Sequence, residues 1–439
     1  MKLSMSHAQL AVVLGCVLAP GCKASAPSSA SDPTDSVTST VDATASPDSD
    51  TNHDDASEDD DGDDDAGGGS LALSFVEIDV AGGLSLTTEF RFLPGTMEFL
   101  ALSKSGRVDH YALSGEQAQH LGGFQLPGAY SDLDCGLLSL AFDPQFARNR
   151  FLYLGTCISV THSAIYRVTF DATAYDDIGS SRAEILIQGD PEAPKPWHNI
   201  GQIGFDEDGY LWALLGDKRV SANGQDVSND LASLILIEPN REPDGVGHQP
   251  APDGPWANEP DASANLRAIG LRSPWRGLLD AEHRYWFGDV GANGFEEINI
   301  VSQPGQNFGW PTHQGPREED CAGFTDPVVS WAHEGTHPYQ LDDPDVSSTN
   351  ARVAWVGLQY MAEGGDQYDG ALTGTVLFGD YCLGFVRGLD VDGNGTVVSD
   401  RHLGHLRFPT AWNEGTDGFI YVSTFGKCET AGLDDADPP

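Results

Sequence analysis

Apolar and polar residues alternate in short runs along most of the chain after residue 70. One arrangement recurs: an apolar strand, a turn rich in Asp and Gly, then a strand with aromatic residues that ends in small ones. Clear copies are LLSLAFDPQFARNRFLYLGT, QIGFDEDGYLWALLGD, RGLLDAEHRYWFGDVG and TAWNEGTDGFIYVSTFG. Alternation between turn signals indicates antiparallel hairpins, and regular recurrence indicates sheets arranged around an axis.

We therefore predict an all-β fold, a six-bladed β-propeller over residues 71–432, followed by a disordered tail at 433–439. A pair of stacked sheets is the alternative. The inner strands of a propeller converge on an axial channel, and the loops at its mouth gather residues that are distant in sequence. An active site would therefore take one or two residues from each of several blades.

The first 22 residues have a different pattern. Met1-Lys2 precede the apolar run AQLAVVLGCVLAP, and Gly21-Cys22 follow it. We predict a lipoprotein-type signal peptide over residues 1–22, with acylation of Cys22. A match ending at Cys16 competes, and cleavage without lipid stays open. The protein would then be exported, as a periplasmic or outer-surface lipoprotein or otherwise secreted, with a lipid anchor as its only membrane contact.

Residues 23–70 are rich in Ser, Thr, Pro, Ala and Asp and end in SEDDDGDDDAGGGS. Such a segment buries too little apolar surface to offset its ordering entropy, so we predict a disordered acidic tether. A calcium-binding tail is the alternative. The whole chain has a formal net charge of −44, which argues against nucleic acid or anionic lipid as a partner.

The cysteines fit an exported protein. Cys135 and Cys157 flank two apolar runs joined by a polar turn, and a hairpin would place them opposite each other as a disulfide. Cys321, Cys382 and Cys428 form an odd set, and the sequence does not decide which two of them pair. None of these cysteines has the close spacing of a zinc knuckle.

Three longer phrases go beyond a generic propeller: HNIGQIGFDEDGYLW from residue 198, AIGLRSPWRGLLD at 268–280 and FGDVGANGFEEINIVSQPGQNFGWP at 287–311. Their order and wording resemble the quinoprotein glucose and sorbosone dehydrogenase family, soluble sugar dehydrogenases that use pyrroloquinoline quinone (PQQ), and its hedgehog-interacting-protein-like relatives. CGLLSLAFDPQF, GD at 216–217 and FGDYCLG support the match, which covers nearly all of the chain after the tether.

The resemblance implies roles for particular residues. His198 would be the base that takes a proton from a sugar hydroxyl while hydride leaves for the quinone. Arg272 would hold the quinone and stabilise the arriving negative charge. The backbone carbonyls of Gly291 and Ala292 would bind the cofactor-associated Ca²⁺. A sugar or polyol substrate and an external electron acceptor are implied as partners.

Other cofactor-binding positions depart from the family pattern. Ser273 follows Arg272 where the family has asparagine, and Asp134 replaces an amide. Asn199 and Arg407 are the remaining candidates for cofactor contact, and a basic position of the family falls at about Cys382. Because each lost charged hydrogen bond removes about 1.5–3 kcal/mol, a cofactor with several carboxylates would bind less tightly.

Structural explanations compete with several of these roles. His198 can be a hydrogen-bonding residue at a strand start, and Arg272 can neutralise an acidic rim. The adjacent Glu296 and Glu297 point to opposite faces of a strand, so we do not predict an acid and base pair. DVDGNG at 390–395 lacks the last ligand of a calcium loop and indicates a hairpin turn. Candidate sugar-lining residues are Trp197, Trp275, Trp310 and His333.

Two functions follow. The first is an exported oxidoreductase that uses PQQ and Ca²⁺ to oxidise an aldose or a related polyol. The second is a catalytically silent propeller that binds a glycan, a protein or calcium. The combined persistence of the histidine, arginine and glycine-loop phrases favours the enzyme.

Overall fold

The computed structural model describes residues 9–14, 72–81, 84, 86–316, 323–333 and 352–425. Contacts divide the chain into one unit of residues 1–17 and 71–439 and another of residues 18–70. The predicted tether belongs to the second unit and lies outside the described residues. Within the described ranges no helix is long and apolar enough to cross a membrane.

The described strands form five hydrogen-bonded sheets, and three of them are four-stranded sheets in simple antiparallel order. One sheet contains β7 (Leu137–Phe142), β8 (Phe151–Cys157), β9 (His162–Thr169) and β10 (Ala183–Gly189). The next contains β11 (Ile200–Phe205), β12 (Leu211–Leu215), β13 (Ser233–Pro239), β14 (His248–Pro250), β15 (Leu266–Ile269) and β19 (Gln306–Asn307). A third contains β16 (Pro274–Leu279), β17 (Tyr285–Asp289), β18 (Phe295–Val301) and β20 (Val329–Ala332). A fourth contains β21 (Ala354–Gln359), β22 (Val376–Asp380), β23 (Phe385–Val391) and β24 (Val397–His405).

The fifth sheet is larger, and it makes the prediction of six blades wrong. Its order is β25-β26-β1-β2-β6-β5-β4-β3. The strands are β1 (Gln9–Leu14), β2 (Leu73–Val80), β3 (Thr87–Phe92), β4 (Glu98–Ser103), β5 (Arg107–Ser114), β6 (Gln117–Gln125), β25 (Pro409–Glu414) and β26 (Ile420–Thr424). Since β1 and β2 pair in parallel and bridge β26 to β6, the first and last strands share one sheet and the propeller has five blades.

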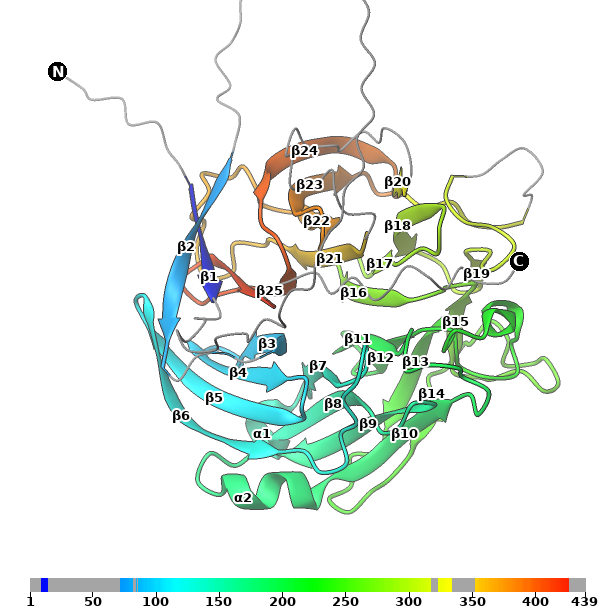
Figure 1. Ribbon diagram of the computed structural model, residues 1–439, viewed down its shortest axis with the longest axis horizontal. Coiled ribbons are helices and arrows are strands. Elements are labelled where there is room, and N and C mark those ends of the chain that lie inside the picture. The colour runs from blue at the N-terminus through cyan, green and yellow to red at the C-terminus, as the bar shows by residue number, and fades with distance from the viewer. Residues whose placement is uncertain are drawn as a thin grey trace, which may run out of the picture. The chain divides into compact units, whose positions relative to one another are not determined.

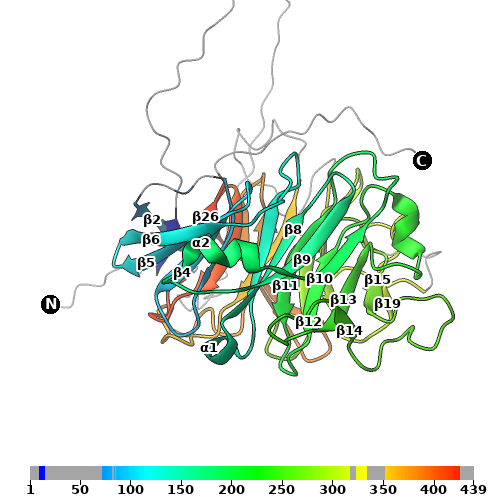
Figure 2. The same ribbon diagram turned by 90° about the horizontal axis from the view of Figure 1, so that it is seen from below.

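The inner strands close into a ring, to which the eight-stranded sheet contributes two strands, β25 and β3. β3, β7, β11, β16, β21 and β25 each contact the next in this order, and β25 contacts β3. Figure 1 looks into this ring, with β3, β11, β16 and β25 around the centre. Figure 2 shows β8, β9 and β11 to β13 running side by side from one face to the other. Ends of strands that are distant in sequence therefore meet near the axis.

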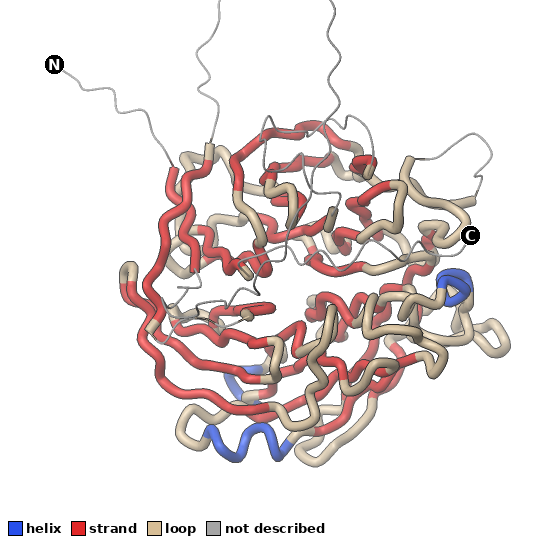
Figure 3. The backbone as a smooth tube through the Cα atoms, viewed as in Figure 1, coloured by secondary structure: helices blue, strands red, loops and turns tan. Residues whose placement is uncertain are grey.

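Apolar side chains fill the spaces between neighbouring sheets because each strand alternates its side chains between the two sheet faces. One core cluster joins β7 to β9 with β11 to β13, and another joins β16 to β18 with β21 to β23. Stacked Trp355 and Trp412, with ring centroids 4.9 Å apart, connect β21 to β25. Short helices α1 (Phe146–Asn149) and α2 (Tyr175–Ile178) lie away from the axis (Figure 3).

Two local predictions are confirmed. Cys135 and Cys157 form a disulfide at the open end of the β7–β8 hairpin. The DVDGNG stretch forms the turn between β23 and β24, where the Asp392 carboxylate accepts hydrogen bonds from two turn N–H groups. Cys382 is also disulfide-bonded, and its partner lies outside the described residues.

Candidate active site at the propeller axis

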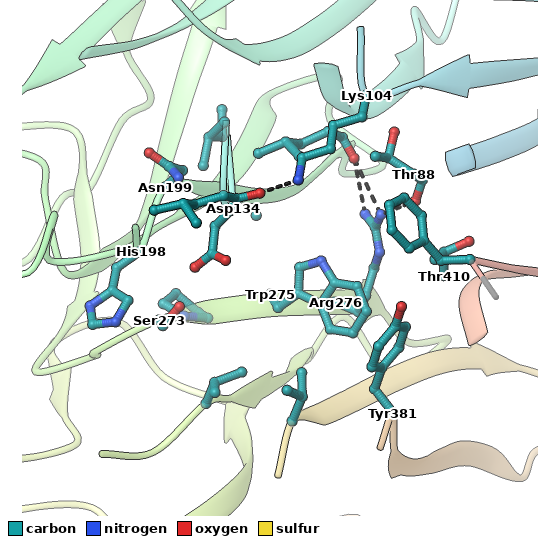
Figure 4. Close-up of a pocket in the computed structure, with 18 of the residues that line it drawn as sticks. Thr88, Lys104, Asp134, His198, Asn199, Ser273, Trp275, Arg276, Tyr381 and Thr410 are labelled. Atoms are coloured by element: carbon teal, nitrogen blue, oxygen red, sulfur yellow. Dashed lines mark hydrogen bonds between the residues drawn. The ribbon is translucent and has the colours of Figure 1, made fainter. Parts of the chain in front are cut away.

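A cavity of about 300 Å³ lies where the inner strands meet. Every sheet contributes to its wall, through strand ends or the loops beside them. Figure 4 shows the side chains that face it. The lining residues used below are Lys104, Asp134, His198, Asn199, Arg272, Ser273, Trp275, Arg276 and Tyr381. The prediction that distant segments supply one site is therefore met by His198 and Arg272.

His198 forms a buried pair with Asp217, which follows β12. Its Nδ1 lies 2.6 Å from Asp217 Oδ1, and the other carboxylate oxygen accepts a 2.8 Å hydrogen bond from Trp310 Nε1. Burial alone raises the pKa of Asp217, but the His198 pair and the nearby Arg272 outweigh this and lower the pKa overall. An ionised Asp217 fixes the tautomer with a proton on Nδ1 and leaves Nε2 to accept a proton.

The backbone around His198 is tightly constrained. His198 has φ of 51°, a left-handed conformation that is uncommon outside glycine. The backbone of Gly216 passes so close that an added Cβ would lie 2.4 Å from the His198 carbonyl oxygen. The Gly216 N–H donates to Asn199 O at 2.9 Å. The GD phrase therefore serves His198 in two ways, since glycine allows the approach and aspartate orients the imidazole.

Arg272 reaches the same cavity from the loop between β15 and β16. Its Nη1 donates to the carbonyl oxygens of Val290 and Gly291 at 2.9 and 2.8 Å. The Asp289 carboxylate accepts from the backbone N–H groups of Arg272 and Ser273 at 2.9 and 2.7 Å. These bonds hold the Arg272 segment against the end of β17, so the guanidinium is fixed before any ligand arrives.

Asp134 points into the hollow between His198, Ser273 and Trp275 (Figure 4). The surrounding protein raises the pKa of its carboxyl group, while His198, Lys104 and Arg272 pull the pKa in the other direction. The side chain is accessible from the cavity itself, although protein encloses it on the other sides. It is placed to accept a hydrogen bond from a hydroxyl group inside the cavity.

Some lining residues were not foreseen from the sequence. Lys104 follows β4, lines the cavity and donates to the Leu133 carbonyl oxygen. Arg276 on β16 is buried and donates to Gln202 Oε1 at 3.0 Å, with Glu89 at 3.8 Å. Lys104 sits in a polar turn, the ordinary place for a solvated lysine, so no sequence signal marked it.

The remaining predicted residues divide between the cavity and its surroundings. Asn199 and Ser273 line the cavity, and so does Trp275 among the aromatic candidates. Arg407 is not among the lining residues. Trp310 and Gly291 line a smaller neighbouring hollow of about 10 Å³. The guanidinium of Arg219 lies over Trp197, with its Cζ 4.4 Å from the centroid of the Trp197 ring. His333 bonds Glu296 at 2.7 Å.

The adjacent glutamates have separate structural partners. Glu296 accepts from Gly291 N–H and Ala354 N–H at 3.0 and 2.7 Å. Glu297 accepts from Gly315 N–H at 2.6 Å, and burial raises its pKa to about 7. They do not converge on one reacting point, as their alternation on β18 predicts.

Comparison with known proteins decides the family. Residues 84–427 match the family described as Glucose / Sorbosone dehydrogenase. The chain belongs to this family. It is 25% identical over 348 residues to the aldose sugar dehydrogenase YliI of Escherichia coli, covering 76% of this chain and 85% of that protein. It is 30% identical over 367 residues to the HIPL1 protein of Arabidopsis thaliana, and there it spans only 51% of the relative's length.

Solved structures share the fold of this family member. The PQQ-bound form of aldose sugar dehydrogenase from Streptomyces coelicolor aligns with a TM-score of 0.59 at 20% identity, over 80% of this chain and 93% of that one. The apo form of the soluble Escherichia coli enzyme aligns with a TM-score of 0.58 at 20% identity, over 77% and 93%. The resemblance inferred from the sequence phrases is thus confirmed, and the family is one of sugar dehydrogenases.

Proposed function

We propose that this protein oxidises a hydroxyl-bearing carbon of an aldose or related polyol, with PQQ as the group that takes up the electrons. The arrangement of His198 carries the proposal. Its Nδ1 is bound to a buried carboxylate, the ring borders the axial cavity, and Arg272 borders the same cavity. A base that borders a ligand-sized hollow beside a fixed cation, with one ring nitrogen held by a carboxylate, is the constellation that alcohol oxidation requires.

The cavity fits an anionic, planar cofactor. Its volume of about 300 Å³ lies at the lower end of ordinary ligand sites. Lys104, Arg272 and Arg276 contribute positive groups, and Trp275 packs edge-on against Tyr381 with centroids 5.5 Å apart. Lys104 and Arg272 would hold carboxylate or carbonyl oxygens of PQQ. These three cations offset the loss of basic residues at the cofactor-binding positions of the family.

The chain's own groups account for the proton and for substrate orientation. His198 Nε2 accepts the proton of the substrate hydroxyl as the C–O bond becomes a carbonyl, and Asp217 stabilises the imidazolium that results. Asp134 accepts a hydrogen bond from a second hydroxyl and so orients the sugar. Arg272 stabilises negative charge that develops near it. Bound PQQ supplies the acceptor for the hydride that leaves the same carbon.

Calcium does not fit the predicted carbonyl site in this arrangement. The Gly291 carbonyl oxygen accepts from the Arg272 guanidinium at 2.8 Å, and this positive charge would repel a Ca²⁺ ion bound to the same oxygen. Ala292 does not line the cavity. Within the described ranges no three His, Cys, Asp or Glu side chains converge as a metal site. No step above depends on Ca²⁺.

Steady-state kinetics test the proposed function. The purified protein is incubated with PQQ and assayed with a panel of aldoses and polyols and an artificial electron acceptor. We expect the wild-type protein to reduce the electron acceptor when sugar is added. In His198→Ala the kcat of this reaction should be about 10²–10⁴-fold lower. His120→Ala is the matched control, since His120 is exposed and pairs with Asp109 on the surface. Absence of turnover with every sugar, together with absence of PQQ binding, would favour the binding-module alternative.

We also propose export and lipid anchoring through Cys22. The signal-like pattern of residues 1–22 supports this, as does the Cys135–Cys157 disulfide, since disulfides persist in oxidising compartments. Cleavage before Cys22 would remove β1, so the eight-stranded sheet described above is that of the uncleaved chain. Expression in a bacterial host that acylates lipoproteins, followed by mass spectrometry of the mature N-terminus, should find a lipidated Cys22. An unmodified N-terminus, or one beginning elsewhere, contradicts the anchor.

A further inference from the structure

Lys218 is a buried lysine directly behind the wall of the axial cavity. Only 1% of its surface is exposed, although lysine is almost never buried without an anionic partner. Its Nζ donates to Asn199 Oδ1 at 2.6 Å and to Ser163 Oγ at 2.8 Å. Both acceptors are neutral, and no carboxylate among the described residues pairs with it.

These bonds connect the histidine loop to the neighbouring sheet. Ser163 belongs to β9, whereas Asn199 directly follows His198 and immediately precedes β11. The Lys218 N–H also donates to the His198 carbonyl oxygen at 3.2 Å. Asn199 Nδ2 in turn donates to Pro196 O at 2.9 Å. The Asn199 side chain therefore links Lys218 to Pro196 across the turn that presents His198, and the Lys218 backbone holds the same turn at His198.

We propose that Lys218 is a positioning residue, which ties Asn199 to Ser163 and thereby fixes the His198 turn in the cavity wall. It touches neither the cavity nor the reacting atoms, so it acts only through Asn199 and the His198 backbone. Three consecutive residues then act on the same turn. Gly216 allows the close backbone approach, Asp217 orients the imidazole and Lys218 holds the turn. As a role in catalysis it rests on the proposed function, but the structural coupling does not.

The charge state of Lys218 makes this coupling sensitive to pH. Burial lowers the pKa of Lys218 to about 7. The neutral amine has two N–H donors for its two acceptors, whereas the ammonium has a third N–H and a charge without an anion. The titratable side chains next to Lys218 and Ser163 in sequence have other partners: Asp217 bonds His198, and His162 bonds Thr161 at 2.8 Å. The turn should therefore loosen progressively as pH falls from about 10.5, the ordinary pKa of lysine, to about 7, with little further change below pH 7.

Hydrogen exchange on the protein without cofactor or sugar tests the proposal. Amides of residues 195–201 are followed at pH 6 and pH 8, corrected for intrinsic rates, in wild type, Lys218→Met and Lys218→Gln. In wild type we expect stronger protection at pH 8. Lys218→Met should exchange about tenfold faster at pH 8, the effect of losing about one hydrogen bond, with no difference between the two pH values.

Lys218→Gln keeps a donor and should restore part of the protection, again without pH dependence. Lys195→Met is the matched control, because Lys195 lies over Trp197 in the same loop but does not reach Asn199. Wild-type protection and pH response in Lys218→Met would overturn the proposal, as would a loss spread evenly over all five sheets. If Lys218→Met does not fold, Lys218→Gln tests the proposal alone. Its protection should not differ between pH 6 and pH 8, and a wild-type pH response in it would overturn the proposal. If the exchange rates are as expected but the protein oxidises no sugar, only the proposed function is contradicted.

Discussion

The His198 imidazole depends on a single buried carboxylate for its orientation. Asp217 Oδ1 lies 2.6 Å from Nδ1, and the second oxygen is held by Trp310. An asparagine there would present an N–H group or a weaker acceptor, and would favour the tautomer with its proton on Nε2. That tautomer cannot accept a proton at Nε2, so the base would be lost while the ring stays in place.

We therefore predict that Asp217→Asn lowers kcat by at least about 10²-fold and changes PQQ affinity little. Kinetics and a PQQ binding titration measure the two effects separately. Asp226→Asn is the control, since Asp226 caps a surface turn through Ser228. Full activity in Asp217→Asn would contradict the role of His198 as base.

Lys104 provides a second residue-scale prediction. Lys104→Met should weaken equilibrium PQQ binding by about tenfold or more, because one charged hydrogen bond contributes about 1.5–3 kcal/mol. Lys104→Arg should retain most of the affinity. Quenching of protein fluorescence by added PQQ is a suitable measurement. Equal affinity in wild type and Lys104→Met would remove Lys104 from the cofactor site.

The sequence identified His198 and Arg272, which line the cavity, but only part of their surroundings. His198 and Arg272 were identifiable because several family phrases surround them. Lys104 and Arg276 were missed, since a lysine in a polar turn and an arginine on a strand are ordinary surface features until ring closure turns them toward the axis. Arg407 was selected from a matching stretch, and yet it does not line the cavity.

At the scale of elements, the spacing of inner strands decides whether the cavity forms. Gly201 on β11 faces β16 so closely that an added Cβ would lie 2.2 Å from the Pro274 carbonyl oxygen. Gly201→Ala should push the two strands apart and lower the free energy of unfolding by about 1–3 kcal/mol. Chemical denaturation measures this change.

Gly393 offers a matched control for that substitution. It lies in the β23–β24 turn, and a Cβ added there meets no atom within 4 Å. Gly393→Ala should leave stability nearly unchanged. Equal effects of the two alanines would show that strand spacing at the axis is not a constraint. The hairpins themselves were predictable from alternation and turn residues, whereas this spacing depends on contacts between sheets.

At the scale of the whole molecule, closure of the ring was predictable but the number of blades was not. Hairpin repeats show how many antiparallel units the chain contains. They cannot show that β1 and β2 join the first and last units into one eight-stranded sheet, because that pairing is parallel and long-range. Residues 1–22 were assigned as a signal peptide from their composition. Composition carries no information on strand pairing, so the pairing of β1 could not be predicted.

Buried carboxylates make stability depend on pH. Asp380 accepts from the N–H groups of Cys382 and Leu383, both at 2.9 Å. Burial, followed by the charge of Glu296, raises the pKa of Asp380 to about 7. The folded protein thus holds this proton up to a higher pH than the unfolded chain, so its contribution favours folding at low pH and is lost as pH rises from about 4 to 7.

We predict that Asp380→Asn removes this component, so that its free energy of unfolding falls less than that of wild type between pH 4 and 7. Lost hydrogen bonds should also lower its stability by about 1–3 kcal/mol at low pH. Denaturant titrations at several pH values measure both effects. An unchanged pH slope would contradict the raised pKa of this carboxyl.

The central claim is that the axial cavity binds a quinone and that His198 makes the bound quinone reducible by sugar. An anaerobic single-turnover experiment tests it most directly: PQQ-loaded protein is mixed with aldoses, and the quinone absorbance is followed. We expect stoichiometric binding and rapid sugar-dependent loss of the oxidised absorbance in wild type, with binding but no rapid loss in His198→Ala. Absence of binding, or equal reduction rates in the two proteins, would contradict the account.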